Sequence, residues 1–135
     1  MRSQPDAPDH LSLEALVELA KDAGGASHHL RVVQMPINLA MTEAIRAPTQ
    51  TVDGKALPAI EAAAALGLMV VASASLMQGK LTSGLPGAVA DAFPTMATDA
   101  QRAIAFARSV PGVTAALVGT KHTGHVDENL QAVVR

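Results

Sequence analysis

Apolar and polar positions follow one another along the chain in an order that predicts alternating helices and strands. Residues 1–10 are polar, contain two prolines and predict an unstructured lead-in. Ser12 is a candidate N-cap for a helix that ends near Ala23, because apolar side chains then recur on one face and two glycines follow. Residues 30–35 predict a short strand, which Pro36 ends.

The same order of helix and strand then occurs twice more. A proline at the first turn and a glycine at the end predict a helix over residues 58–66. The continuous apolar run 68–72 is typical of a strand that is buried on both faces. Residues 98–101 form a capping box that opens a helix to about Ser109, and a second buried strand is expected over 113–118.

The last helix is predicted up to the C-terminus, with one apolar face formed by Val126, Leu130, Val133 and Val134. Helices that alternate with fully apolar strands indicate an α/β fold with a parallel sheet and helical crossovers. The longest stretches expected to be irregular are 40–55 and 82–97. Loops of that length in an α/β protein often cover a ligand.

Three parallel strands leave two open edges and apolar surface that must be covered. Self-association would cover them, as would a larger sheet or barrel to which this chain contributes, and we expect the second arrangement. Residues 59–77 are apolar apart from Glu61 and a few serines, but Gly67 divides them into an alanine-rich half and a β-branched half. This division predicts helix, turn and strand rather than a membrane span.

The composition fits one folded domain. The chain has 135 residues, of which 49% are hydrophobic and 16% charged, so it can bury a core and does not resemble a disordered sequence. A formal net charge of −2 and few aromatic residues argue against nucleic-acid binding. No apolar run follows the first residues, so we expect no secretory signal and a cytoplasmic location.

Several residue types are absent, and their absence excludes whole classes of chemistry. The sequence has no cysteine, which excludes disulfide scaffolds, thiolate zinc sites and cysteine nucleophiles. It has no tryptophan and no tyrosine, and Phe93 and Phe106 are its aromatic residues. A mechanism that needs a tyrosine as proton donor therefore cannot run on these residues.

Candidate chemistry lies where the three predicted strands end, because ligands of parallel α/β folds bind at the carboxyl ends of the strands. The segments concerned are 34–38, 73–81 and 119–125, and the last two are rich in glycine and hydroxyl groups. Backbone amides at such helix starts suit a phosphate group, to which Lys121 adds a positive charge. Ordinary polar turns remain the alternative, since no P-loop or dinucleotide fingerprint is present.

The sequence gives less support to a metal site or to a serine nucleophile. His122 and His125, with the acidic residues behind them, have poor spacing for metal ligands, so no metal site is predicted. Ser73 and Ser75 do not lie in a nucleophile motif. We expect their hydroxyl groups to satisfy backbone groups at the end of a strand.

Residues 33–38, 75–81 and 119–130 together resemble the C-terminal half of an aldo-keto reductase in their order and spacing. The resemblance covers about residues 11–135. It implies a partial (β/α)8 TIM barrel, in which this chain supplies the last three strands with their helices. It also implies a binding site for NADP(H).

The resemblance assigns roles to individual positions. Gln34 would face the nicotinamide carboxamide, and Ser73 stands where the family commonly has an aromatic residue that stacks on the nicotinamide. Lys121 would contact the 2′-phosphate, which favours NADP(H) over NAD(H). The other implied contacts are Ser75, Leu76, Gln78 and Gly79 at the pyrophosphate, Gly119, Thr120, His122 and His125 in the phosphate loop, and Glu128 and Asn129 at the adenine.

The family's catalytic aspartate, tyrosine, lysine and histidine belong to its N-terminal half, which this sequence lacks. We therefore expect the NADP(H)-binding part of a reductase, inactive toward carbonyl compounds alone and paired with a complementary half-barrel or with itself. We expect neither nucleic acid nor membrane as partner. A self-associating nucleotide-binding or structural module is the alternative from another class, and a truncated relic that does not fold cooperatively is a third. The sequence does not identify a carbonyl substrate.

Overall fold

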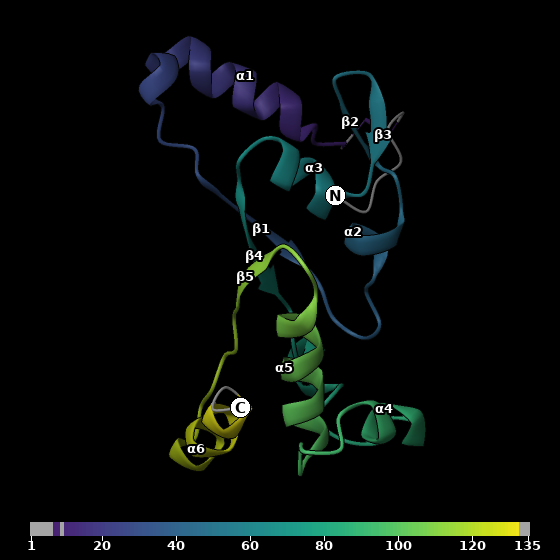
Figure 1. Ribbon diagram of the computed structural model, residues 1–135. Coiled ribbons are helices and arrows are strands. Elements are labelled where there is room, and N and C mark those ends of the chain that lie inside the picture. Colours follow the sequence, from purple (N-terminus) through teal and green to yellow (C-terminus); the bar gives the residue numbers. More distant parts are fainter. Residues whose placement is uncertain (1–6, 9, 133–135) are drawn as a thin grey trace.

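A parallel sheet of three strands lies at the centre of the fold (Figure 1). The computed structural model describes residues 7–8 and 10–132. The strands β1 (Val32–Pro36), β4 (Met69–Ser73) and β5 (Val113–Ala116) lie in the order β1-β4-β5. All neighbours are parallel, which confirms the predicted α/β class. Within the described part of the chain the sheet does not close into a barrel.

Long helices alternate with these strands, as the sequence predicts. They are α1 (Leu13–Gly24), α3 (Ala59–Ala65), α5 (Asp99–Ser109) and α6 (Thr123–Gln131). The Ser12 hydroxyl accepts a hydrogen bond from the Ala15 N–H at 3.2 Å, so the predicted cap of α1 is confirmed. The capping box of α5 is confirmed as well, because Thr98 and Gln101 each accept a hydrogen bond from the other's backbone N–H.

The two stretches expected to be irregular contain regular elements, so that expectation was wrong. The first holds α2 (Glu43–Arg46) and an antiparallel hairpin of β2 (Gln50–Val52) and β3 (Lys55–Leu57), and the second holds α4 (Gly87–Ala92). Gln50 explains why the hairpin is stable. Its buried side-chain amide accepts from the Leu13 N–H at 2.8 Å and donates to the Leu11 carbonyl at 3.1 Å. The hairpin thus depends on α1, a contact that local sequence does not reveal.

The strands β1 and β4 are buried on one face only, and β5 has no fully buried residue, which corrects the expectation of burial on both faces. Val33, Met35, Val70 and Ala72 pack in one core cluster with side chains from α1, α3 and α5. The alternate positions face away from the helices, and this second face of the sheet is called the open face below. Val32 is 44% exposed and Met69 47% exposed on it. The apolar run predicts two-sided burial, but the described chain supplies a helical layer on one side alone.

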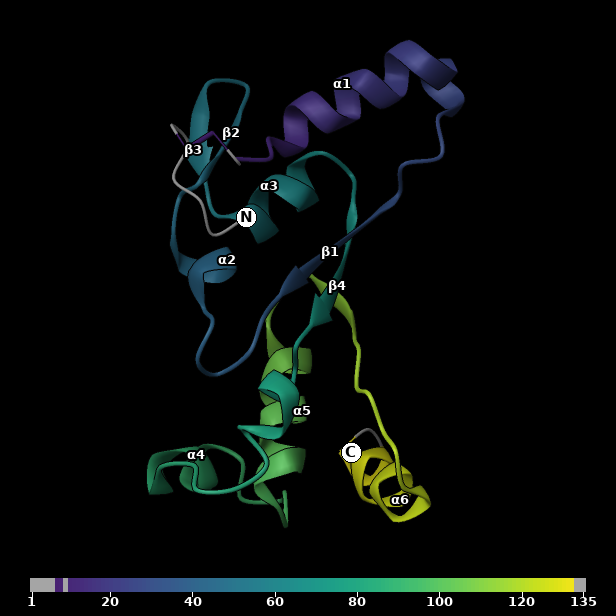
Figure 2. The same cartoon turned by 180° about the vertical axis from the view of Figure 1, so that it is seen from behind.

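The carboxyl ends of the strands point toward the part of the fold that holds α4 and α6 (Figures 1 and 2). The N-terminal helix α1 and the β2–β3 hairpin lie at the opposite end. None of the described helices has the length and apolar character needed to cross a bilayer. On α6, Val126 and Leu130 are exposed, whereas Val133 and Val134 of the predicted apolar face lie outside the described residues.

Candidate functional site

Two adjoining clefts lie where β4 and β5 end and α6 begins. The smaller has a volume of about 270 Å³ and the larger about 480 Å³. Leu76, Thr82, Gly119 and His125 line both clefts, so the two hollows share a wall. The carboxyl ends of parallel strands are the usual place for a ligand in α/β folds, and the predicted site therefore falls at a hollow surface.

Most of the residues predicted as nucleotide contacts meet at these clefts. The smaller cleft is lined by Thr120, Glu128 and Asn129 in addition to the shared wall. The larger is lined by Ser75, Gln78 and Gly79. Residues 74–82 and 117–129, which are far apart in the sequence, thus come together, as expected from the parallel strand order.

Four predicted contacts lie outside the cleft walls. Gln34 lies on β1 and Ser73 at the end of β4. Lys121 and His122 are exposed in the segment between β5 and α6. The His122 ring lies against that of His125, with centroids 5.4 Å apart and planes perpendicular. His122 therefore contacts a residue of the cleft walls without lining a cleft itself.

Ser75, one of the residues that line the larger cleft, is buried with its hydroxyl unpaired. The residue is 1% exposed, and its hydroxyl has no hydrogen-bond partner within the described chain. The expectation that this hydroxyl satisfies backbone groups at the strand end was wrong. Those groups are satisfied by others, because the Ala74 carbonyl accepts from the Asn38 side chain at 2.9 Å and from the Met77 N–H at 2.8 Å. A buried hydroxyl without a partner costs about 1–3 kcal/mol.

Asn38 is a site-building residue that the sequence does not reveal. It is fully buried just beyond β1, and its side-chain oxygen accepts from the N–H groups of Ala40 and Met41, each at 2.9 Å. Its amide nitrogen bonds to Ala74, so one side chain joins the loops that follow two adjacent strands. The signal available in the sequence was only its place at the end of a predicted strand.

The loop after β4 curls tightly on itself at the wall of the larger cleft. Met77, Gln78 and Gly79 have φ angles of 47°, 55° and 85°, so three successive residues take the left-handed conformation. The Gly79 and Leu81 N–H groups donate to the Leu76 carbonyl. These amides are therefore engaged within the loop. The exposed side chain of Gln78, which lines the larger cleft, is better placed than these amides to contact a ligand.

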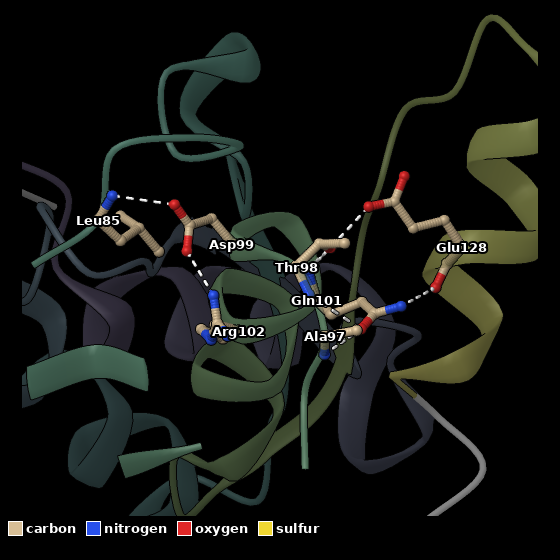
Figure 3. Close-up of polar contacts among 7 residues, drawn as sticks. All are labelled: Leu85, Ala97, Thr98, Asp99, Gln101, Arg102 and Glu128. Carbon is tan, nitrogen blue, oxygen red and sulfur yellow. Dashed lines mark hydrogen bonds and ion pairs between the residues drawn. The ribbon is translucent and has the colours of Figure 1, made fainter. Parts of the chain in front are cut away.

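A polar network fixes α6 against the start of α5 (Figure 3). The Thr98 hydroxyl donates to one carboxylate oxygen of Glu128 at 2.6 Å. The buried Gln101 side chain donates to the Glu128 carbonyl at 3.0 Å and accepts from the Ala97 N–H at 2.8 Å. Glu128 thus holds α6 in place through its backbone and one oxygen. Its second carboxylate oxygen makes no contact drawn in Figure 3.

The Asp99 carboxylate holds the loop before α5 and makes its stability depend on pH. Its carboxylate accepts from the Leu85 N–H at 3.0 Å and from Arg102 at 2.7 Å (Figure 3). These groups, the Leu85 N–H first, hold the pKa of Asp99 below its ordinary 3.8.

The lowered pKa of Asp99 stabilises the fold at a pH above the ordinary pKa, and that stabilisation is lost as the pH falls toward the folded-state pKa. Urea unfolding midpoints below about pH 4 should therefore fall more steeply in the wild type than in Asp99→Asn. Asp91→Asn, an exposed change on α4, is the matched control, and equal slopes for wild type and Asp99→Asn would contradict the assignment.

The clefts offer hydroxyl, amide, imidazole and carboxylate groups. No group of three or more histidine, aspartate or glutamate side chains lies close enough for a metal ion in the described ranges 7–8 and 10–132. Neither a protein-family model nor a curated protein matches the sequence. The case for a function therefore rests on the geometry and chemistry of the clefts.

Proposed function

We propose that this chain binds NADP(H), with the adenosine and pyrophosphate portions in the two adjoining clefts. The observation that carries the proposal is that most of the predicted cofactor contacts, which come from the segments after β4 and β5, line the two adjoining clefts. These contacts belong to the segments on which the resemblance to an aldo-keto reductase depends. A hydroxyl and glycines beside a helix start suit a phosphate-bearing ligand.

The residues that line the clefts each have a proposed contact with the cofactor. Ser75, Gln78 and Gly79 would surround the pyrophosphate in the larger cleft. Glu128 would use its second carboxylate oxygen, and Asn129 its side-chain amide, for the adenosine end in the smaller cleft. Lys121, exposed beside Thr120, would pair with the 2′-phosphate.

The proposed activity is binding rather than turnover. Bound NADPH supplies a hydride, but carbonyl reduction in the resembling family also needs a tyrosine as proton donor. The sequence contains no tyrosine. We therefore propose that the chain alone reduces aldehydes and ketones at no measurable rate, and that a partial (β/α)8 barrel of this kind acts with a complementary half.

Lys121→Ala tests the cofactor assignment. Loss of the ammonium should weaken NADPH about fivefold to tenfold, because one charge-assisted contact to the 2′-phosphate is removed, and leave NADH within about twofold. Isothermal titration calorimetry with both cofactors measures the difference. Lys55→Ala, which removes an equal charge from the distant β3 strand, should change neither affinity. Equal losses for NADPH and NADH in Lys121→Ala would remove Lys121 as the 2′-phosphate contact.

A second candidate function is self-association, which the open face of the sheet favours. Leu117 is 49% exposed beyond β5, and Val32 and Met69 are similarly exposed on β1 and β4. The strands β1 and β5 are also free at the sheet edges within the described chain. Exposed apolar patches and open edges promote pairing between copies. Sedimentation that shows a dimer at micromolar concentration, unaffected by NADPH, would favour this candidate.

A further inference from the structure

We infer that a groove along β5, separate from the two clefts, binds an aliphatic monocarboxylate such as a medium-chain fatty acid. The groove has a volume of about 400 Å³ and lies between the second half of α5, the edge strand β5 and one face of α6. Figures 1 and 2 show α5 and α6 side by side beyond the sheet. Volumes of about 300–1,000 Å³ are usual for small-molecule sites. The groove is not part of the proposed cofactor site, although Thr120 and Asn129 border both.

Aliphatic side chains line most of the groove. Ile104 of α5 is buried, whereas Val126 and Leu130 of α6 are 43% and 53% exposed. The apolar wall is completed by Ala115, Ala116 and Val118, from β5 and the segment after it. An alkyl chain along this wall would cover the exposed α6 side chains, and the removal of apolar surface from water favours binding.

Arg108 supplies a positive charge at one end of the groove. One guanidinium nitrogen, Nη1, donates to the Ala132 carbonyl at 2.7 Å, which fixes the side chain beside the end of α6. Within the described chain no carboxylate forms an ion pair with Arg108. The guanidinium edge formed by Nε and Nη2 therefore remains for a ligand, and this fork geometry matches the two oxygens of a carboxylate.

The single charge and the apolar wall together define the ligand class. Among the described residues that line the groove, Arg108 alone is charged, so a monoanion matches it better than a phosphate dianion does. A carboxylate at Arg108 would direct its alkyl chain past Leu130 toward Val126, one turn earlier on α6. An aliphatic monocarboxylate satisfies both features at once.

Titration of the full chain with decanoate below its micelle concentration, followed by amide NMR spectra, tests this assignment. The amide signals of residues 114–118 and 126–130 should shift, and decanoate should bind about fourfold tighter than octanoate, because two more methylene groups are partly buried. Decyltrimethylammonium has the same chain length and the opposite charge, and it should bind about tenfold more weakly or not at all. Equal affinity for the two ions, or shifts spread over the whole chain, would overturn the inference.

Arginine variants test the role of the guanidinium. Arg108→Gln should weaken decanoate about fivefold or more, because the charge-assisted contact with the carboxylate is lost. Arg108→Lys keeps the charge without the fork, and its affinity should lie between those of the wild type and Arg108→Gln. Arg46→Gln removes an exposed charge from α2 and should change the affinity by less than about twofold. Equal affinities for the wild type and Arg108→Gln would contradict the assignment.

Leu130→Asp tests the apolar wall without a change at Arg108. The side chain is more than half exposed, so the fold should tolerate the aspartate, whose charge repels a carboxylate in the groove. Decanoate binding should fall about tenfold or more, whereas Leu19→Asp, on the exposed face of α1, should leave it unchanged. Sedimentation identifies the competing occupant: a wild-type dimer that Leu130→Asp dissociates and decanoate does not affect would assign the groove to a second copy and overturn the inference. Failure of NADPH to bind a chain that binds decanoate would contradict the proposed function alone.

Discussion

Replacing Leu13 with alanine should lower the free energy of unfolding by about 3 kcal/mol. Leu13 is the first residue of α1 and is fully buried, in one core cluster with Val17 and with side chains of the sheet and of α3. Truncation removes apolar contact and leaves a cavity that the surrounding residues fill only in part. Its backbone N–H, bonded to Gln50, also ties the helix to the hairpin. Urea unfolding followed by circular dichroism measures the loss.

Leu19→Ala is the matched control, because it makes the same chemical change on the same helix. Leu19 is 64% exposed, so the free energy of unfolding should change by no more than about 0.5 kcal/mol. Similar losses for the two variants would mean that α1 does not pack on the core through Leu13.

Gln101→Leu should destabilise the protein by about 2–3 kcal/mol and loosen α6 in particular. The leucine keeps the volume but removes the acceptor for the Ala97 and Thr98 N–H groups and the donor to the Glu128 carbonyl. One half of the capping box is lost, and buried groups between α5 and α6 become unpaired. Amide hydrogen exchange over residues 123–131 should therefore accelerate more than exchange over α3.

Gln131→Leu serves as the control for this variant. Gln131 is exposed, and its contact with Gln101 is long, at 3.4 Å, so the free energy of unfolding should change by less than about 0.5 kcal/mol. Unchanged exchange in α6 of Gln101→Leu would show that other contacts hold the helix. One of these is the bond from Arg108 to the Ala132 carbonyl at 2.7 Å.

Local chemistry made the helices and strands predictable. Ser12 and Thr98 cap helices with their own side chains, within three residues of the groups that they bind. The apolar runs located the three strands to within about two residues, as is usual for element ends. The parallel order also predicted that the segments after β4 and β5 would meet, and they form the walls of the clefts.

Contacts between distant residues account for what the sequence did not reveal. Gln50 bonds to Leu13, 37 residues away, and this contact is part of what makes the hairpin regular. Thr98 bonds to Glu128 across 30 residues, so a residue predicted as an adenine contact also anchors α6. The sequence could not reveal that Met69 is exposed, because an apolar strand residue is equally compatible with a covered and an uncovered face of the sheet. The described chain covers one face of the sheet only, and Met69 lies on the other.

A thermal melt followed by far-ultraviolet circular dichroism, with and without NADPH, tests whether the folded chain binds this cofactor. At one hundred times the dissociation constant, a ligand that binds only the folded chain adds about 2.7 kcal/mol to its stability. We expect one cooperative transition whose midpoint rises with NADPH concentration. A cooperative transition with the same midpoint at every NADPH concentration would contradict the proposal that the chain binds NADP(H).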